Sequence, residues 1–223
     1  MNIIARIETD FPEKFGIPRQ SGLLETAKGV IVFEPAYRSA DAIKGIEGYD
    51  YLWLLWQFEG VERETWSPMV RPPRLGGNEY VGVFATRSPF RPNPIGLSSV
   101  KLEKVVLDSD RGPLLYVSGV DMRHNTPIYD IKPYLAYTDA HLDAKGGFAG
   151  GVLGYKLEVE FPEDLLAQSP VGRQDEIIKL LEQDPRPSYH NDPERVYGVR
   201  YADWDVKFVV REDVLKVVGI EII

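Results

Sequence analysis

The sequence predicts a mainly β protein, with an N-terminal all-β barrel and a small C-terminal α+β domain. Short strand-like segments follow one another through the first two thirds of the chain, separated by glycine, proline and aspartate. Nothing before residue 147 resembles a helix of three turns or more. Repeated β structure with so little helix excludes a βαβ nucleotide-binding fold and favours a barrel or sandwich. Four glycines in seven residues at 145–151 indicate a joint, which divides the chain into domains at 1–145 and 146–223.

The N-terminal strands are predicted from short apolar or alternating runs. The run at 51–58 is apolar at nearly every position, so we expect a central strand buried on both faces. A short helix is expected at 40–46, with Ser39 as its N-cap. The other expected strands are 2–8, 29–33, 80–85, 98–107 and 114–120.

The C-terminal segment has a clearer helical signal. Residues 174–183 place Ile177, Ile178, Leu180 and Leu181 on one side of a helix that ends before Pro185. Alternating or β-branched runs predict strands around this helix, at 155–161, 196–201, 204–211 and 215–222.

Composition bounds the class of protein. The chain has no cysteine, which excludes disulfides, thiolate catalysis and cysteine-held metals. The histidines lack ligand spacing, so we expect no metal site. No apolar run approaches the roughly 20 residues that span a bilayer, and Arg6, Glu8 and Asp10 interrupt any signal-peptide pattern at the start. We therefore expect a cytoplasmic protein that does not enter a membrane.

Charge is distributed unevenly along the chain. The net charge of −8 by itself argues against a nucleic-acid partner. Residues 69–101, however, hold five cations and a single anion, Glu79. Such segregation is compatible with one anion-binding face on an acidic protein.

The most informative segment is residues 82–98. Pro89, Pro92 and Pro94 each fix φ and remove a backbone donor, so a helix or a central strand is excluded and a stiff, extended loop is expected. This loop presents Arg87, Arg91 and Asn93 for recognition. Gly96 then allows the backbone to approach a neighbouring group closely.

Three further segments are candidates for the same site. Residues 15–22 and 66–78 are compact loops rich in proline, glycine and arginine. In residues 121–134, Asp130 and Lys132 fall on one face of an extended backbone. The plain interpretation of that pair is a solvated ion pair at a strand edge, worth little energetically. Several such loops on one β scaffold favour convergence on a common site.

These segments together resemble the TsaA-like (YaeB, TrmO) family of S-adenosylmethionine-dependent tRNA methyltransferases. The resemblance rests on long motifs in the same order, at residues 18–20, 70–78, 82–98 and 126–134, with a C-terminal signature at 183–189. It covers nearly the whole chain.

The resemblance implies methyl transfer to N6 of threonylcarbamoyl-adenosine next to the tRNA anticodon. It also implies a non-Rossmann β-barrel and a homodimer with its site near the subunit interface. The sequence departs from the family pattern at two places: Glu59 stands where many members have histidine, and His124-Asn125 where many have Asp-Gly. The cofactor-binding positions implied by the resemblance are Pro18, Arg19, Gln20, Phe58, Glu59, Arg87, Leu97, His124, Asn125, Thr126 and Pro127.

Roles for the remaining residues follow from their chemistry. Asp130 would accept or position the proton of the acceptor nitrogen and Lys132 would stabilise the developing charge, unless alignment alone suffices and no base acts. Arg87 or Arg91 would bind a carboxylate of the cofactor or the substrate. Arg71 and Arg74 would contact the tRNA backbone. Tyr134 or Phe90 would stack on an extruded base. Two alternatives are a non-catalytic RNA-binding barrel and a small-ligand-binding regulatory module.

Overall fold

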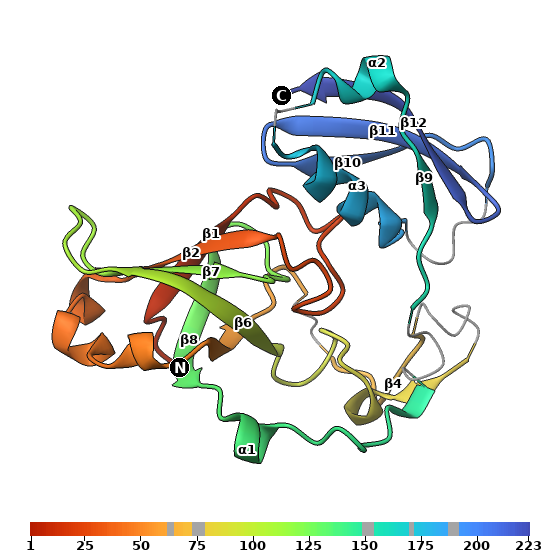
Figure 1. Cartoon of the computed structure of the whole chain (residues 1–223). Helices are drawn as coiled ribbons and strands as arrows, with labels where there is room; N and C mark the ends of the chain where they lie inside the picture. The colour runs from red at the N-terminus through yellow and green to blue at the C-terminus, as the bar shows by residue number, and fades with distance from the viewer. Residues whose placement is uncertain (62–64, 73–78, 149–153, 170–171, 187–191) are drawn as a thin grey trace.

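The two main β structures among the described residues are a closed barrel and a four-stranded sheet (Figure 1). The computed structural model describes residues 1–61, 65–72, 79–148, 154–169, 172–186 and 192–223. Arg74 and residues 149–151 of the 145–151 joint therefore lie outside the described residues. In the part of the chain that is described, no helix is both long and apolar enough to cross a membrane.

The barrel closes six antiparallel strands in the order β1-β2-β7-β6-β3-β8. Alternating burial forms its core, as in β3, where Leu52, Leu54 and Trp56 point inward. The segment at 51–58 is therefore not buried on both faces, because a barrel strand turns alternate side chains outward. The strand bounds are β1 Ala5–Thr9, β2 Lys28–Phe33, β3 Tyr51–Gln57, β6 Ile95–Val106, β7 Leu114–Ser118 and β8 Thr126–Pro133.

One end of the barrel gathers the loops that the sequence marks as functional. Because neighbouring strands run antiparallel, the segments 10–27, 58–94 and 119–125 all emerge at the same end. We call this end the loop end. The 58–94 segment contains a two-stranded ladder of β4 (Met69–Val70) and β5 (Val81–Gly82).

Three local predictions are wrong. The expected strand at 80–85 is β5 followed by a 3₁₀ turn at Val83–Ala85. The expected helix at 40–46 is a 3₁₀ turn at Ala40–Ile43, and Ser39 makes no side-chain cap there. The proline-bearing loop, predicted to extend to residue 98, ends before Ile95, because Ile95 pairs with Gln57 of β3 and is the first residue of β6.

The C-terminal α+β domain is a sheet in the order β10-β11-β12-β9, with β9 parallel to β12. Its elements are β9 Glu158–Glu160, α2 Glu163–Leu166, α3 Gln174–Glu182, β10 Tyr197–Tyr201, β11 Trp204–Arg211 and β12 Val214–Ile222. The predicted helix is confirmed as α3, which buries Ile177, Leu180 and Leu181. In Figure 1, α3 lies on the side of the sheet that faces the barrel. A short helix, α1 (Ala136–Asp139), follows the barrel.

Candidate functional site

A polar chain of three side chains lies inside the loop end. Trp56 Nε1 donates a hydrogen bond to Ser98 Oγ at 2.9 Å, and Ser98 Oγ donates to Asp121 Oδ1 at 2.6 Å. Trp56 and Ser98 are both buried because they occupy inward positions of β3 and β6. Gly96 stands opposite Trp56, and a Cβ at Gly96 would lie 2.2 Å from the indole. The predicted close backbone approach at Gly96 is thus confirmed, and its neighbour is Trp56.

Asp121 has an unusual environment for a carboxyl group. Burial raises its pKa to about 6, against the opposing effects of hydrogen bonds from Ser98 and from the Ser21 backbone and of the nearby Arg87 charge. Asp121 therefore exchanges its proton close to neutral pH, in a position that faces the cationic loop.

The β1–β2 loop closes over this chain. Ser21 Oγ accepts the backbone N–H of Ser99 at 3.2 Å, at a point where β6 extends beyond its partner β7. The Gly22 N–H binds the Gly119 carbonyl at 2.9 Å. Arg87 donates a hydrogen bond to Gln20 Oε1. Three loops far apart in sequence therefore meet around Asp121.

Other predicted cofactor residues lie beside this cluster or are turned away from it. The Phe58 ring packs 4.2 Å from Trp56, and Glu59 forms an ion pair with Arg123 at 2.9 Å. Pro18 is buried. The Arg19 guanidinium donates to the carbonyl of Asp184 at 3.1 Å, so it points toward the C-terminal domain.

The 124–127 segment is held mainly through its backbone. The His124 N–H donates to Phe11 O at 2.8 Å, and the Asn125 N–H donates to Ile7 O at 2.8 Å. Asn125 has a φ of 66°, in the left-handed region that asparagine tolerates. Thr126 and Pro127 are buried, and Thr126 Oγ1 donates to the Arg123 carbonyl. The exposed part of this loop is therefore His124 and Asn125.

Asp130 and Lys132 lie on the outer face of the barrel. They form an ion pair at 2.8 Å, as their spacing predicts. Leu97 and Asp130 flank Leu55 from the two neighbouring strands. Leu97 and Lys132 border a surface depression of about 370 Å³, whose lining is Trp53, Leu55, Leu97, Lys132, Thr138, Asp139 and His141. The structure thus places the predicted residues in two groups, one at the loop end and one on this outer face.

The predicted substrate residues are also divided. Arg91 donates to the backbone carbonyls of Thr86 and Ser88 at 3.2 and 3.3 Å, so part of its guanidinium braces the loop. Arg71 stacks 4.5 Å over the exposed Tyr80 ring. Asn93 is exposed on the same loop. Tyr134 packs 5.4 Å from Trp53 and is only partly exposed.

Sequence reasoning missed Ser21, Trp56, Ser98, Asp121 and Arg123 as members of the site. Ser98 had a usable signal, since a polar residue at an inward strand position requires a buried partner. Asp121 had none, because its burial depends on the loop that contains Ser21. Within the described ranges, no three acidic, histidine or cysteine side chains form a metal-binding cluster.

This architecture defines a class of protein in which a closed antiparallel barrel, and not a doubly wound α/β sheet, presents the functional loops. The family model for the tRNA-methyltransferase O N-terminal domain matches residues 6–140. The model for the C-terminal domain of the same family matches residues 155–223. The chain therefore belongs to the tRNA-methyltransferase O family, as its motifs predict.

Relatives and solved structures agree with this assignment. A protein of Escherichia coli (strain K12) named tRNA (adenine(37)-N6)-methyltransferase is 38% identical over 226 residues, covering 98% of this chain and 96% of its own length. A Pseudomonas aeruginosa PAO1 protein named putative S-adenosylmethionine-dependent methyltransferase RcsF is 40% identical, covering 97% and 95%. The crystal structure of TrmO from Pseudomonas aeruginosa superposes with a TM-score of 0.75 at 34% identity, covering 98% and 96%. The predicted fold class is confirmed.

Proposed function

We propose that this chain transfers a methyl group from S-adenosylmethionine to N6 of threonylcarbamoyl-adenosine next to the anticodon of tRNA. The observation that carries the proposal is the meeting of Gln20, Arg87 and Asp121 from three separate loops at one end of the barrel. Relatives that match nearly the whole chain are named tRNA (adenine(37)-N6)-methyltransferases, which supports the reaction type.

The side chains at the loop end suit the cofactor. S-adenosylmethionine supplies the methyl group, which its positively charged sulfonium makes electrophilic. Arg87 and Gln20 offer donors for a carboxylate, and the ionised Asp121 offers a negative charge for a cationic ligand. Phe58 is partly exposed beside Trp56 and provides apolar surface for a purine, whereas Leu97 is exposed on the outer face of the barrel. The exposed residues His124 and Asn125 complete the cofactor side of the proposed site.

Asp130 and Lys132 would manage the proton. Asp130 would take, directly or through a water molecule, the proton that the acceptor nitrogen loses when the S–CH₃ bond is exchanged for an N–CH₃ bond and S-adenosylhomocysteine leaves. The Lys132 ammonium, 2.8 Å from the Asp130 carboxylate, would stabilise negative charge that develops on the substrate. An alternative in which alignment alone suffices and no side chain acts as base stays open.

The RNA would lie along the cationic loops. Arg71, Arg91 and Asn93 are presented around the loop end, and Arg74 belongs to the same stretch of sequence. The exposed Trp66 and Phe84 rings lie 5.9 Å apart there, which adds a surface on which unpaired bases of the anticodon stem-loop can stack. Phe90 and Tyr134 are further candidates for stacking on the target base.

We further propose that the chain acts as a cytoplasmic homodimer with domains at 1–145 and 146–223. Leu97, Tyr137 and Leu142 are exposed apolar side chains near the outer-face depression, which supports a subunit contact there.

The deciding experiment is isothermal titration with S-adenosylhomocysteine, followed by a methyl-transfer assay on threonylcarbamoyl-modified tRNA. One saturable site per chain and methylated adenosine are expected. Ligand binding without RNA binding would favour a small-ligand module, and RNA binding without ligand binding would favour a non-catalytic barrel. Arg87→Lys should weaken S-adenosylhomocysteine binding although the charge is kept, because a single ammonium group cannot reproduce a bidentate contact to a carboxylate. Asp130→Asn should lower turnover and leave ligand affinity unchanged.

A further inference from the structure

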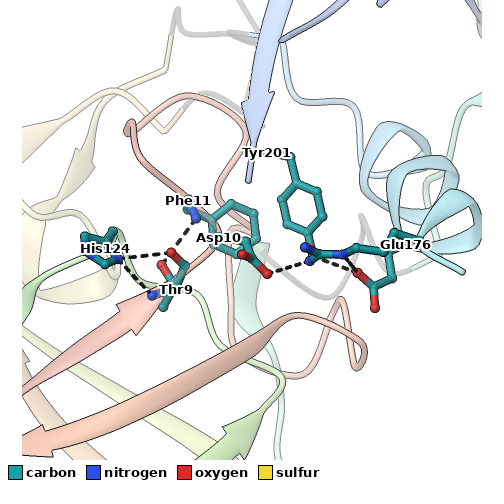
Figure 2. A network of polar contacts seen from close by, with 7 residues as sticks. Thr9, Asp10, Phe11, His124, Glu176 and Tyr201 are labelled. Atoms are coloured by element: carbon teal, nitrogen blue, oxygen red, sulfur yellow. Dashed lines mark hydrogen bonds and ion pairs between the residues drawn. The ribbon is translucent and has the colours of Figure 1, made fainter. Parts of the chain in front are cut away.

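Three residues, Thr9, Asp10 and Phe11, join the 124–127 loop to the C-terminal domain (Figure 2). We call Thr9–Phe11 the bridge. On the barrel side, the His124 N–H donates to Phe11 O at 2.8 Å, and His124 Nδ1 lies 3.3 Å from the Thr9 nitrogen. Thr9 Oγ1 donates to the Met122 carbonyl at 3.0 Å. The bridge therefore contacts the chain at Met122 and at His124, where the 124–127 loop begins.

On its other side, the bridge is held by Arg173 at the start of α3. The Arg173 guanidinium binds the Asp10 carboxylate and also donates to Glu176 at 2.9 Å and to the Tyr201 hydroxyl at 3.1 Å. Tyr201 in turn donates to Glu176 at 3.1 Å. The Asp10 carbonyl accepts the Ala202 N–H at 2.7 Å. Asp10 thus binds the C-terminal domain through both its side chain and its backbone carbonyl.

Arg173 remains charged in this network. Burial alone would lower the pKa of its guanidinium, but hydrogen bonds to Asp10 and Glu176 raise the pKa above its usual value. Glu176 is 9% exposed and the Asp10 side chain is 33% exposed, and both carboxylates bind the same guanidinium, so without Arg173 the buried Glu176 would lose its ion-pair partner beside a second carboxylate. Substitution of Arg173 would therefore push Asp10, and with it the bridge, away from Glu176.

The second loop of the proposed cofactor site has its own attachment to the same domain. Arg19 donates to the Asp184 carbonyl at 3.1 Å, and Asp184 is fixed by an ion pair with Arg186 in which both side chains are at most 10% exposed. Gly16 packs against Val199 so closely that a Cβ would lie 2.2 Å from a Val199 methyl. The C-terminal domain thus contacts the β1–β2 loop directly, and it reaches the 124–127 loop only through the bridge.

We propose that Arg173 is a positioning residue that sets the conformation of the 124–127 loop through the bridge, so that the C-terminal domain controls ligand affinity at the barrel. The effect on ligand affinity rests on the proposed function. The mechanical link between Arg173 and the loop does not, since it consists of contacts within the chain.

The test compares Arg173→Met with Arg200→Met. Arg200 forms an ion pair of 2.7 Å with Glu13 between the same two parts of the chain, but it does not touch the bridge. Amide hydrogen exchange at His124 and Asn125 reports the loop, and exchange at Leu54 in the barrel core reports overall stability. Arg173→Met should speed exchange at His124 about tenfold relative to Leu54 and weaken S-adenosylhomocysteine binding by a similar factor, in the range of typical site-to-site coupling. Arg200→Met should change both less than about twofold, as expected for an exposed pair.

Equal exchange at His124 in wild type and Arg173→Met would overturn the proposal, and so would equal effects of the two substitutions. Tyr201→Phe, which removes one hydroxyl and keeps the ring, provides the same comparison if Arg173→Met does not fold. A wild-type chain that bound no S-adenosylhomocysteine would refute the proposed function, while the exchange data would still decide the mechanical link. Arg173→Lys, which keeps the charge, should recover part of the loop protection.

Discussion

Replacing Gly96 with alanine would place a methyl group inside the polar chain of the loop end. The new Cβ would lie 2.2 Å from Trp56 Cε2 and 2.4 Å from Cζ2, well inside van der Waals contact. The indole cannot simply move aside. Its Nε1 is bonded to Ser98 Oγ at 2.9 Å and its ring packs 4.2 Å from Phe58. The backbone of β6 is equally fixed, because Gly96 is paired with Trp56 in the ladder.

The expected cost combines two effects. Overpacking of a closely packed core costs about 1–3 kcal/mol. Displacement of the indole would also break the Trp56–Ser98 hydrogen bond, which is worth about 1 kcal/mol when both groups are buried. We therefore expect Gly96→Ala to lower the free energy of unfolding by about 3 kcal/mol. Because Ser98 also holds Asp121, ligand affinity at the loop end should fall as well.

Urea unfolding of Gly96→Ala beside Gly82→Ala tests this reasoning. Gly82 lies nearby in sequence with a φ of −56°, and a Cβ there meets nothing within 4 Å, so its substitution should be nearly neutral. In a double-mutant cycle, Gly96→Ala should destabilise the Trp56→Leu protein much less than the wild type, because the smaller leucine side chain relieves the clash. A stable Gly96→Ala protein, or additive effects of the two substitutions, would refute the argument.

Three other outcomes follow from the structure. The pKa of Asp121 is about 6 in the folded protein and about 3.9 in the unfolded chain, so its contribution to the free energy of unfolding falls by at most about 3 kcal/mol as pH rises from about 4 to about 6. Asp121→Asn should abolish this part of the pH dependence in urea midpoints measured across the same range. An unchanged pH profile in the variant would contradict the argument. Gly16→Ala should lower the free energy of unfolding by about 2–4 kcal/mol, because the new methyl group clashes with Val199 and the φ of +86° strains an alanine. Gly22→Ala, at a φ of +79° in open space, should show the backbone strain alone. Equal losses of stability in thermal unfolding would exclude the clash. Arg71→Ala should weaken tRNA binding and reduce the slope of log affinity against log salt by about 1, measured by fluorescence anisotropy; an unchanged slope would remove Arg71 from the phosphate contacts.

Local patterns were sufficient for much of the fold. Helix α3 and strands β10 to β12 follow directly from the spacing of apolar residues, because each pattern is continuous and ends at a turn or proline. The 3₁₀ turn at 83–85 could not be predicted in this way, because Val83 and Phe84 have strand propensity. In the structure, the Val83 N–H is hydrogen-bonded to the Pro68 carbonyl, and the Val83 side chain is buried. Similarly, β3 has apolar residues on both faces, although one face is outside the barrel.

For the candidate site, the sequence by itself determined which loops are stiff, where cations gather, and that Asp130 and Lys132 share a face. Its long motifs also determined the family. Only the tertiary structure decided that Arg19 is directed to the C-terminal domain, that Arg91 braces its own loop, and that Ser98 and Asp121 are hydrogen-bonded at the loop end. The physical reason is that residue type and spacing fix local backbone preferences, whereas burial, partner choice and the resulting pKa depend on strands and loops that meet only when the barrel closes.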